Sequence, residues 1–125
     1  MHLSRRERQI MDVIYGSGRA TAAEVQERMH DAPSYSAVRA LLAILVEKGM
    51  LKIEEDGPRY VYLPTRPREQ AGRSAIQHVM RTFFDGSVEK AVAALLAPRD
   101  GRLSKEEIGR LEALIERARK GERVS

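Results

Sequence analysis

The chain lacks several residue types and patterns that whole classes of protein require. None of its 125 residues is a cysteine, which excludes disulfides, thiolate metal sites and cysteine nucleophiles. No apolar run approaches the ~18 residues of a membrane-spanning helix. The first nine residues, MHLSRRERQ, lack the apolar core of a secretory signal. We therefore expect a cytoplasmic protein with no direct membrane insertion.

The motifs of common enzyme classes are also missing. The sequence has no glycine-rich phosphate loop, no His-Glu-x-x-His and no Gly-x-Ser-x-Gly. Its three histidines, His2, His30 and His78, fall on separate predicted elements, and the acidic run Glu54–Asp56 fits a solvated hairpin tip better than a catalytic cluster. We expect no enzyme activity, no metal site and no cofactor.

Positive charge is modest and evenly spread. The formal net charge is +4, with 10 Lys/Arg against 9 Asp/Glu in residues 1–66 and 12 against 9 in residues 67–125. This balance favours an anionic partner only weakly. If the chain binds nucleic acid, individually placed arginines must make the contacts, because their forked guanidinium groups suit phosphates and guanine.

Three short helices are predicted in the first 50 residues. Capping boxes at Ser4–Glu7 and Thr21–Glu24 begin the first two. Ser34 caps the third, and Gly49 suits its C-terminus. Apolar residues recur through this third helix at helical spacing: Val38, Leu41, Leu42, Leu45 and Val46. The alternating segments LKIEE and RYVYL, on either side of Asp-Gly-Pro, then predict a β-hairpin.

A proline-rich segment at residues 64–67 marks a predicted domain boundary. Beyond it, apolar stripes over residues 75–84, 88–96 and 108–118 predict helices, with a loop at residues 98–101 and a capping box at Ser104–Glu107. We predict a mainly α fold with a small β-hairpin wing. An N-terminal winged helix-turn-helix domain would occupy residues 1–66, and a helical dimerisation domain residues 67–125.

The third predicted helix has the form of a DNA-recognition helix. Its apolar face would anchor it, while its outward arc carries the short side chains of Ser36, Ala40 and Ala43 and one long cation, Arg39. Small side chains let a helix approach the floor of the major groove. The alternative is an ordinary amphipathic helix with a solvated Ser and Arg. The hairpin and the short capped helix before it favour DNA binding.

Four segments together resemble one known family. They are LSRRERQIMDVIYGSGRATAAEVQERM, YSAVRALLAILVEKGMLKIEEDGPRYVYLP, FFDGSVEKAVAALL and LSKEEIGRLEALI. Their order and spacing are similar to those of the penicillinase-repressor family. The resemblance implies a homodimeric winged-helix transcriptional repressor that binds a palindromic operator and dimerises through its C-terminal helices. It also implies a role in an antibiotic response, with a membrane sensor-protease that triggers release from DNA.

The resemblance and the helix pattern together assign candidate site residues. Nine are expected to contact double-stranded operator DNA, with Arg59 on the phosphate backbone and Arg39 on a phosphate or a base: Thr21, Ser34, Tyr35, Ser36, Ala37, Arg39, Ala40, Arg59 and Tyr60. The C-terminal segment has too little chain to bury three apolar stripes against itself. Ten residues are therefore expected in the dimer interface: Ile76, Met80, Phe83, Phe84, Val92, Leu95, Leu96, Leu111, Leu114 and Ile115.

The chain departs from the family pattern in two places. The family's Tyr-Thr-Thr is Tyr35-Ser36-Ala37 here, and Ala40 replaces a typical Thr, so we expect a different operator preference. Some members are cut at an Asn-Phe bond near the position of Leu95–Ala97, and this chain has no asparagine. Two other interpretations remain open: a winged helix used only for protein contacts, and a ligand-sensing regulator of another winged-helix type.

Overall fold

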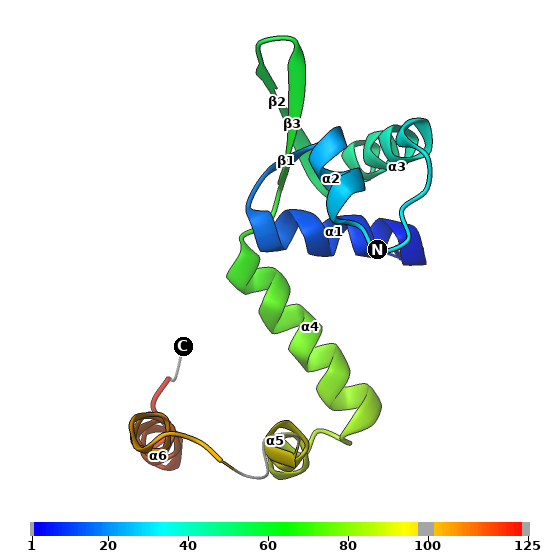
Figure 1. Cartoon of the computed structure of the whole chain (residues 1–125). Helices are drawn as coiled ribbons and strands as arrows, with labels where there is room; N and C mark the ends of the chain where they lie inside the picture. The colour runs from blue at the N-terminus through cyan, green and yellow to red at the C-terminus, as the bar shows by residue number, and fades with distance from the viewer. Residues whose placement is uncertain (1, 98–101, 124–125) are drawn as a thin grey trace. The chain divides into compact units, whose positions relative to one another are not determined.

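The computed structural model describes residues 2–97 and 102–123, so the loop predicted at 98–101 lies outside the described residues. Figure 1 shows helices and short strands in chain order. They are α1 (Arg5–Ser17), β1 (Ala20–Thr21), α2 (Ala22–Arg28), α3 (Tyr35–Glu47), β2 (Leu51–Asp56), β3 (Arg59–Pro64), α4 (Arg68–Phe83), α5 (Val88–Leu96) and α6 (Lys105–Arg119). The predicted fold class, mainly α with a β-hairpin wing, is confirmed. The chain divides into two compact units, residues 1–75 and 76–125.

The helices of the first unit begin where the sequence predicts. The Ser4 Oγ accepts from the Glu7 backbone N–H at 3.2 Å, and the Glu7 carboxylate accepts from the Ser4 N–H at 2.7 Å. Thr21 and Glu24 repeat this box at the start of α2. Ser34 begins α3 by accepting from the Ala37 N–H at 3.2 Å. Each cap satisfies backbone donors that the first helical turn leaves unpaired.

The strands form one antiparallel sheet in the order β1-β3-β2. Strands β2 and β3 make the predicted hairpin, with Gly57 at φ 63° in its turn, a conformation that favours glycine. Strand β1 pairs Ala20 with Tyr62 and Thr21 with Val61. The sequence analysis did not predict β1, because two residues are too few to show an alternating pattern.

The buried core belongs to the first unit. Helices α1, α2 and α3 pack with the base of the sheet around apolar side chains that are at most 7% exposed: Ile10, Met11, Ile14, Ala20, Ala22, Val25, Met29, Val38, Leu42, Leu45, Leu51, Val61 and Tyr62. No described residue of α4, α5 or α6 is buried. None of the helices in the described part of the chain combines the length and apolarity needed to cross a membrane.

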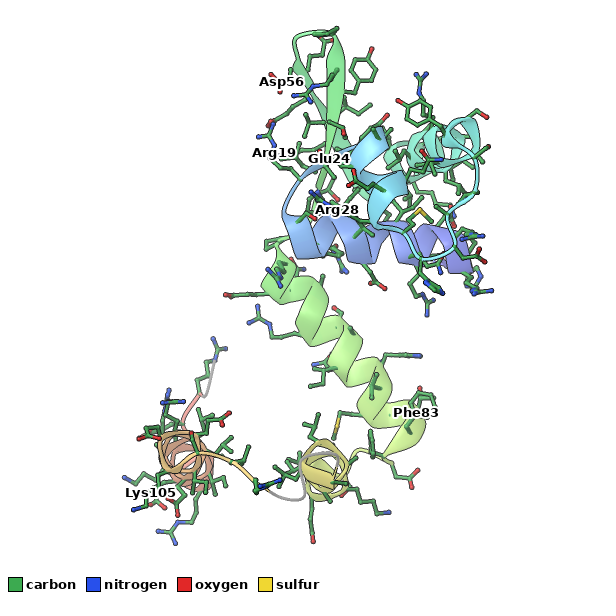
Figure 2. The ribbon with its side chains drawn as sticks, in the orientation of Figure 1. Arg19, Glu24, Arg28, Asp56, Phe83 and Lys105 are labelled. Atoms are coloured by element: carbon green, nitrogen blue, oxygen red, sulfur yellow. The ribbon has the colours of Figure 1, made fainter. Side chains whose placement is uncertain are left out.

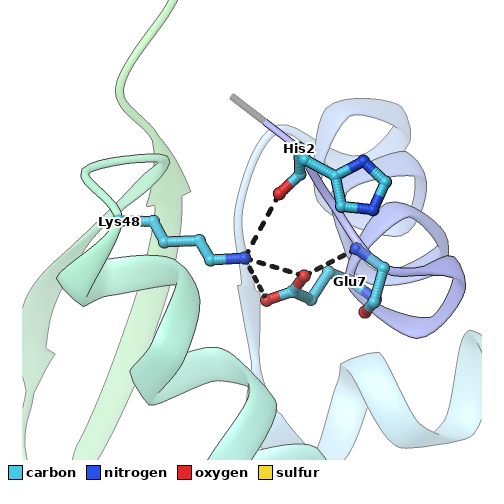
Figure 3. A network of polar contacts seen from close by, with 4 residues as sticks. His2, Glu7 and Lys48 are labelled. Carbon is cyan, nitrogen blue, oxygen red and sulfur yellow. Dashed lines mark hydrogen bonds and ion pairs between the residues drawn. The ribbon is translucent and has the colours of Figure 1, made fainter.

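An ion pair ties the end of α3 to the start of α1. The Lys48 Nζ lies 3.0 Å from each carboxylate oxygen of Glu7 and donates to the His2 carbonyl at 3.3 Å (Figure 3). The Glu7 side chain is only 5% exposed. The hydrogen bond from the Ser4 backbone and the one from Lys48 hold the pKa of Glu7 below its usual value, although burial opposes them. This contact fixes α3 against α1.

Candidate nucleic-acid interface

Helix α3 presents the outward arc that the sequence predicts. Val38, Leu42 and Leu45 are fully buried and hold one face of the helix in the core. The side chains on the opposite side are exposed, and they include Ser36 and Arg39. The helix can therefore present its N-terminal half to a groove without losing its packing.

Hydrogen bonds from two other helices hold the connection that leads into α3. The Arg6 guanidinium donates to the Asp31 carbonyl at 2.7 Å, and the Gln26 amide donates to the Pro33 carbonyl at 3.1 Å. Asp31 itself has a positive φ of 56°, which non-glycine residues adopt uncommonly. The connection between α2 and α3 is thus tied to α1 and α2, which sets where α3 begins.

The wing turns one face toward α3. Opposed residues of an antiparallel pair share a face, and residues two apart on one strand do the same. Tyr62 lies opposite Ile53, and Tyr60 lies opposite Glu55. An open groove of about 530 Å³ separates this face from α3, and it is lined by Tyr35, Ser36, Arg39, Ala40, Ala43, Val46, Ile53, Tyr60 and Tyr62. We call it the helix groove.

A second open groove lies between the wing turn and the start of α2. It has a volume of about 430 Å³ and is lined by Thr21, Ala22, Ala23, Tyr35, Arg39, Pro58, Arg59, Tyr60 and Tyr62. We call it the wing groove. Four residues line both grooves: Arg39 and three tyrosines, Tyr35, Tyr60 and Tyr62. These four side chains therefore lie where the two grooves adjoin.

Arg39 has no hydrogen bond or ion pair with any other residue that the structure describes. Arg39 lines both grooves together with Tyr62. Burial raises the pKa of Tyr62, and the positive charge of Arg39 partly opposes the rise. Tyr62 therefore stays protonated at neutral pH, beside a cation that is available to a ligand.

Arg59 has a partner at the wing turn. Its guanidinium lies 3.1 Å from the carboxylate of Asp56, the residue opposite it in the hairpin, and both side chains are more than half exposed. Arg59 also helps to lower the pKa of Glu24, after the larger effects of the Thr21 hydrogen bonds and of Arg28. Figure 2 labels Asp56 and Glu24 near the wing and α2. An exposed ion pair of this kind is weak, so Arg59 can exchange Asp56 for a phosphate.

Seven of the nine predicted DNA-binding residues line the two grooves: Thr21, Tyr35, Ser36, Arg39, Ala40, Arg59 and Tyr60. The other two, Ser34 and Ala37, lie in the first turn of α3, where the Ser34 hydroxyl is the cap. The Thr21 hydroxyl is also a cap, and that residue is only 9% exposed. DNA contact by all nine stays a prediction.

Of the four residues that line both grooves, Tyr62 is the one that the sequence analysis did not predict. The signal was present, because the alternation in RYVYL places Tyr60 and Tyr62 on the same face of the strand. Only the packing of the wing against α3 shows that this face turns toward Arg39 rather than toward solvent.

The predicted dimer residues lie on α4, α5 and α6. Phe83, labelled in Figure 2, is 71% exposed. Six more are exposed as large apolar side chains: Ile76, Val92, Leu95, Leu111, Leu114 and Ile115. Met80, Phe84 and Leu96 are half-buried.

Within the described residues, no three His, Asp or Glu side chains come together in a way that could hold a metal ion.

Comparisons with known proteins extend over most of the chain. A family model described as penicillinase repressor matches residues 3–117. An uncharacterized 16.5 kDa protein of Latilactobacillus sakei is 25% identical over 111 residues, which are 87% of this chain and 75% of that protein.

Two solved structures are also similar. The CopR repressor is 32% identical over 53% of this chain and 99% of its own, with a TM-score of 0.46. The transcriptional regulator Tm0710 from Thermotoga maritima is 20% identical over 92% of this chain and 77% of its own, with a TM-score of 0.53. The similarity to Tm0710 is a similarity of fold.

Proposed function

The chain belongs to the penicillinase repressor family and is a DNA-binding transcriptional repressor, and we propose that it acts as a homodimer on an interrupted palindromic operator. The resemblance found in the sequence is thereby confirmed. The finer assignments, which are the DNA-contacting residues, the dimer and the release mechanism, form the proposal. We also propose that the protein has no catalytic role and works in the cytoplasm, where operator DNA is found.

The observation that carries the proposal is Arg39 on the exposed side of α3, which has no partner among residues 2–97 and 102–123. An arginine whose guanidinium is not engaged keeps all its donors for a phosphate or for the O6 and N7 atoms of guanine. Its neighbours Ser36, Ala40 and Ala43 are short, so the helix axis can come close to the base edges. Arg59 on the wing would hold the adjacent backbone.

The exposed apolar side chains of the second unit support the homodimer. A soluble monomer rarely exposes large contiguous apolar patches, and such patches mark interaction sites. A second copy of α4 to α6 offers a matching apolar surface, as two-fold symmetry requires. Two recognition helices related in this way would enter successive major grooves about 34–36 Å apart, which predicts two half-sites one duplex turn apart.

We extend the proposal to the release of the repressor from DNA. Family resemblance suggests a membrane sensor-protease as a partner and an antibiotic response as the setting. A protease that cuts Asn-Phe bonds would find no such bond in this chain, because it contains no asparagine. We propose that any proteolytic release uses a different bond.

The test is a gel-shift titration with DNA from the promoter region of the protein's own gene and with scrambled DNA, over a series of salt concentrations. We expect Arg39→Ala to weaken binding, equally on both DNAs if Arg39 holds a phosphate and on the operator alone if it reads a base. We expect Arg59→Ala to weaken all DNA alike and to make the salt slope shallower by about one unit.

Arg110→Ala provides the matched control, because it removes the same charge from the exposed surface of α6. It should leave the affinity for both DNAs unchanged. If wild-type protein shifts neither DNA at low salt, the winged helix serves protein contacts instead. If Arg39→Ala binds both DNAs like wild type, α3 is not the recognition helix.

A further inference from the structure

Tyr62 is held more rigidly than any other tyrosine of the grooves. It lies on β3, the middle strand, between Ala20 of β1 and Ile53 of β2. Its side chain belongs to the buried core, and the residue is only 5% exposed. Tyr35 and Tyr60 are 46% and 49% exposed. A buried ring in a paired strand has little rotamer freedom left to lose when a ligand binds.

The hydroxyl of this buried ring has no hydrogen-bond partner in the part of the chain that the structure describes. Tyr62 makes no hydrogen bond with another described residue. Among the described residues, no fully buried side-chain oxygen or nitrogen lacks a partner, so the Tyr62 hydroxyl oxygen must be accessible. Tyr62 lines both the helix groove and the wing groove, so we infer that its accessible hydroxyl faces these grooves.

Among the described residues, the Tyr62 hydroxyl is thus an unpaired donor and Arg39 an unpaired cation, and both residues line the same grooves. Arg39 lines the same two grooves, and its charge acts on the Tyr62 phenol. A neutral hydroxyl donor next to a guanidinium suits an oxygen that carries negative charge and can accept two hydrogen bonds. A phosphate of the DNA backbone has such oxygens, and tyrosine hydroxyls are among the groups that contact phosphates in protein–DNA complexes.

We propose that Tyr62 is a DNA-binding residue whose hydroxyl donates to the same backbone phosphate that the Arg39 guanidinium holds. This inference rests on the proposed function, since it requires DNA to occupy the grooves between α3 and the wing. The core fixes the Tyr62 donor, and Arg39 supplies the charge. The pair would set how deeply α3 enters the major groove, because a phosphate contact fixes register without reading sequence.

The experiment compares Tyr62→Phe with Tyr15→Phe, measured on operator and scrambled DNA over a salt series. Each substitution removes one tyrosine hydroxyl from the first unit, and Tyr15 lies on α1 and lines neither groove. Tyr62→Phe leaves the ring in the core. We expect Tyr62→Phe to weaken binding to both DNAs about tenfold, the usual size for a hydrogen bond to a charged group. The salt slope should not change, because no charge is removed. Tyr15→Phe should leave the affinity for both DNAs unchanged, because Tyr15 lines neither groove.

A double variant tests whether the two donors share one phosphate. If they do, Tyr62→Phe should reduce the DNA affinity of the Arg39→Ala variant by a clearly smaller factor than it reduces the affinity of the wild type. Thermal unfolding of Tyr62→Phe should match that of the wild type, since the hydroxyl bonds to none of the described residues.

Several results would overturn this inference. They are wild-type affinity in Tyr62→Phe, a loss confined to the operator, full additivity with Arg39→Ala, or a clearly lower unfolding temperature. Failure of the wild-type protein to bind either DNA is a different outcome. It would contradict the proposed function itself.

Discussion

Helices α1 and α6 begin with the same Ser-x-x-Glu box but differ in what their apolar faces contact. In α6, the Ser104 hydroxyl accepts from the Glu107 N–H at 3.0 Å, and the Glu107 carboxylate accepts from the Ser104 N–H at 3.3 Å, as Ser4 and Glu7 do in α1. Helix α1 buries Glu7 and three apolar residues, whereas α6 buries none. An apolar helix face shows that a partner is needed, but it does not show which molecule supplies the partner.

The same difference separates the two units as a whole. The first unit covers its apolar faces with its own helices and strands, and Leu42 and Leu45 are fully buried. In the second unit, Phe83, Leu95 and Ile115 are each about two-thirds exposed or more. Covering apolar surface stabilises a protein by roughly 25 cal/mol per Å². The second copy that we propose would therefore stabilise the second unit by covering these side chains.

The largest expected effect comes from opening the core of the first unit. Leu42→Ala should lower the free energy of unfolding by ~2–5 kcal/mol, the cost of lost burial plus a cavity. Urea unfolding followed by circular dichroism measures this. Ile44→Ala is the matched control, because Ile44 lies on the same helix and is 41% exposed. Equal losses from the two variants would contradict the core that we describe.

The next largest effect is expected from a charge placed on the apolar face of α6. Leu111→Asp places a charge within the proposed dimer interface, and we expect the dimer dissociation constant to rise at least ~30-fold, as for a hot-spot residue. Light scattering at micromolar concentration should then report monomers. Ala113→Asp adds the same charge at an exposed position of the same helix and should leave the dimer intact. If Leu111→Asp stays fully dimeric, the interface lies elsewhere.

The smallest expected effect comes from removing the charge of Glu7 in the capping box of α1, compared with the equivalent change in α6. Since the folded-state pKa of Glu7 lies below 4.5, its carboxylate stabilises the fold above pH 4.5, and this contribution is lost as the pH falls through the folded-state pKa. Glu7→Gln should therefore destabilise the first unit by ~1–3 kcal/mol at pH 7. The difference from wild type should shrink below pH 4.5.

Urea unfolding at pH 7 and at pH 3.5–4.5 measures this pH dependence. Glu107→Gln alters the equivalent box in α6, where no lysine pairs with the carboxylate in the described residues. This substitution should lower the free energy of unfolding much less than Glu7→Gln does. A constant difference between Glu7→Gln and wild type at all pH values would show that the Glu7 charge is not what stabilises the fold.

Much of the fold could be predicted because its signals are local. A helix cap involves residues within four positions of one another, so Ser4, Thr21 and Ser34 mark the starts of α1, α2 and α3 in the sequence itself. The alternation on either side of Asp56-Gly57 does the same for the wing. The exposed arc of α3 also follows from helical spacing, so Ser36, Arg39 and Ala40 were found without a structure.

The sequence by itself therefore determined the helix starts, the hairpin and the outward arc of α3. The tertiary structure alone decided that β1 joins the sheet, that Lys48 pairs with Glu7 across 41 positions, and that Tyr62 turns toward Arg39 rather than toward solvent. The physical reason is the range of each interaction. Caps and turns depend on neighbours along the chain, whereas strand pairing, the buried ion pair and the grooves depend on segments that become neighbours only when the core closes.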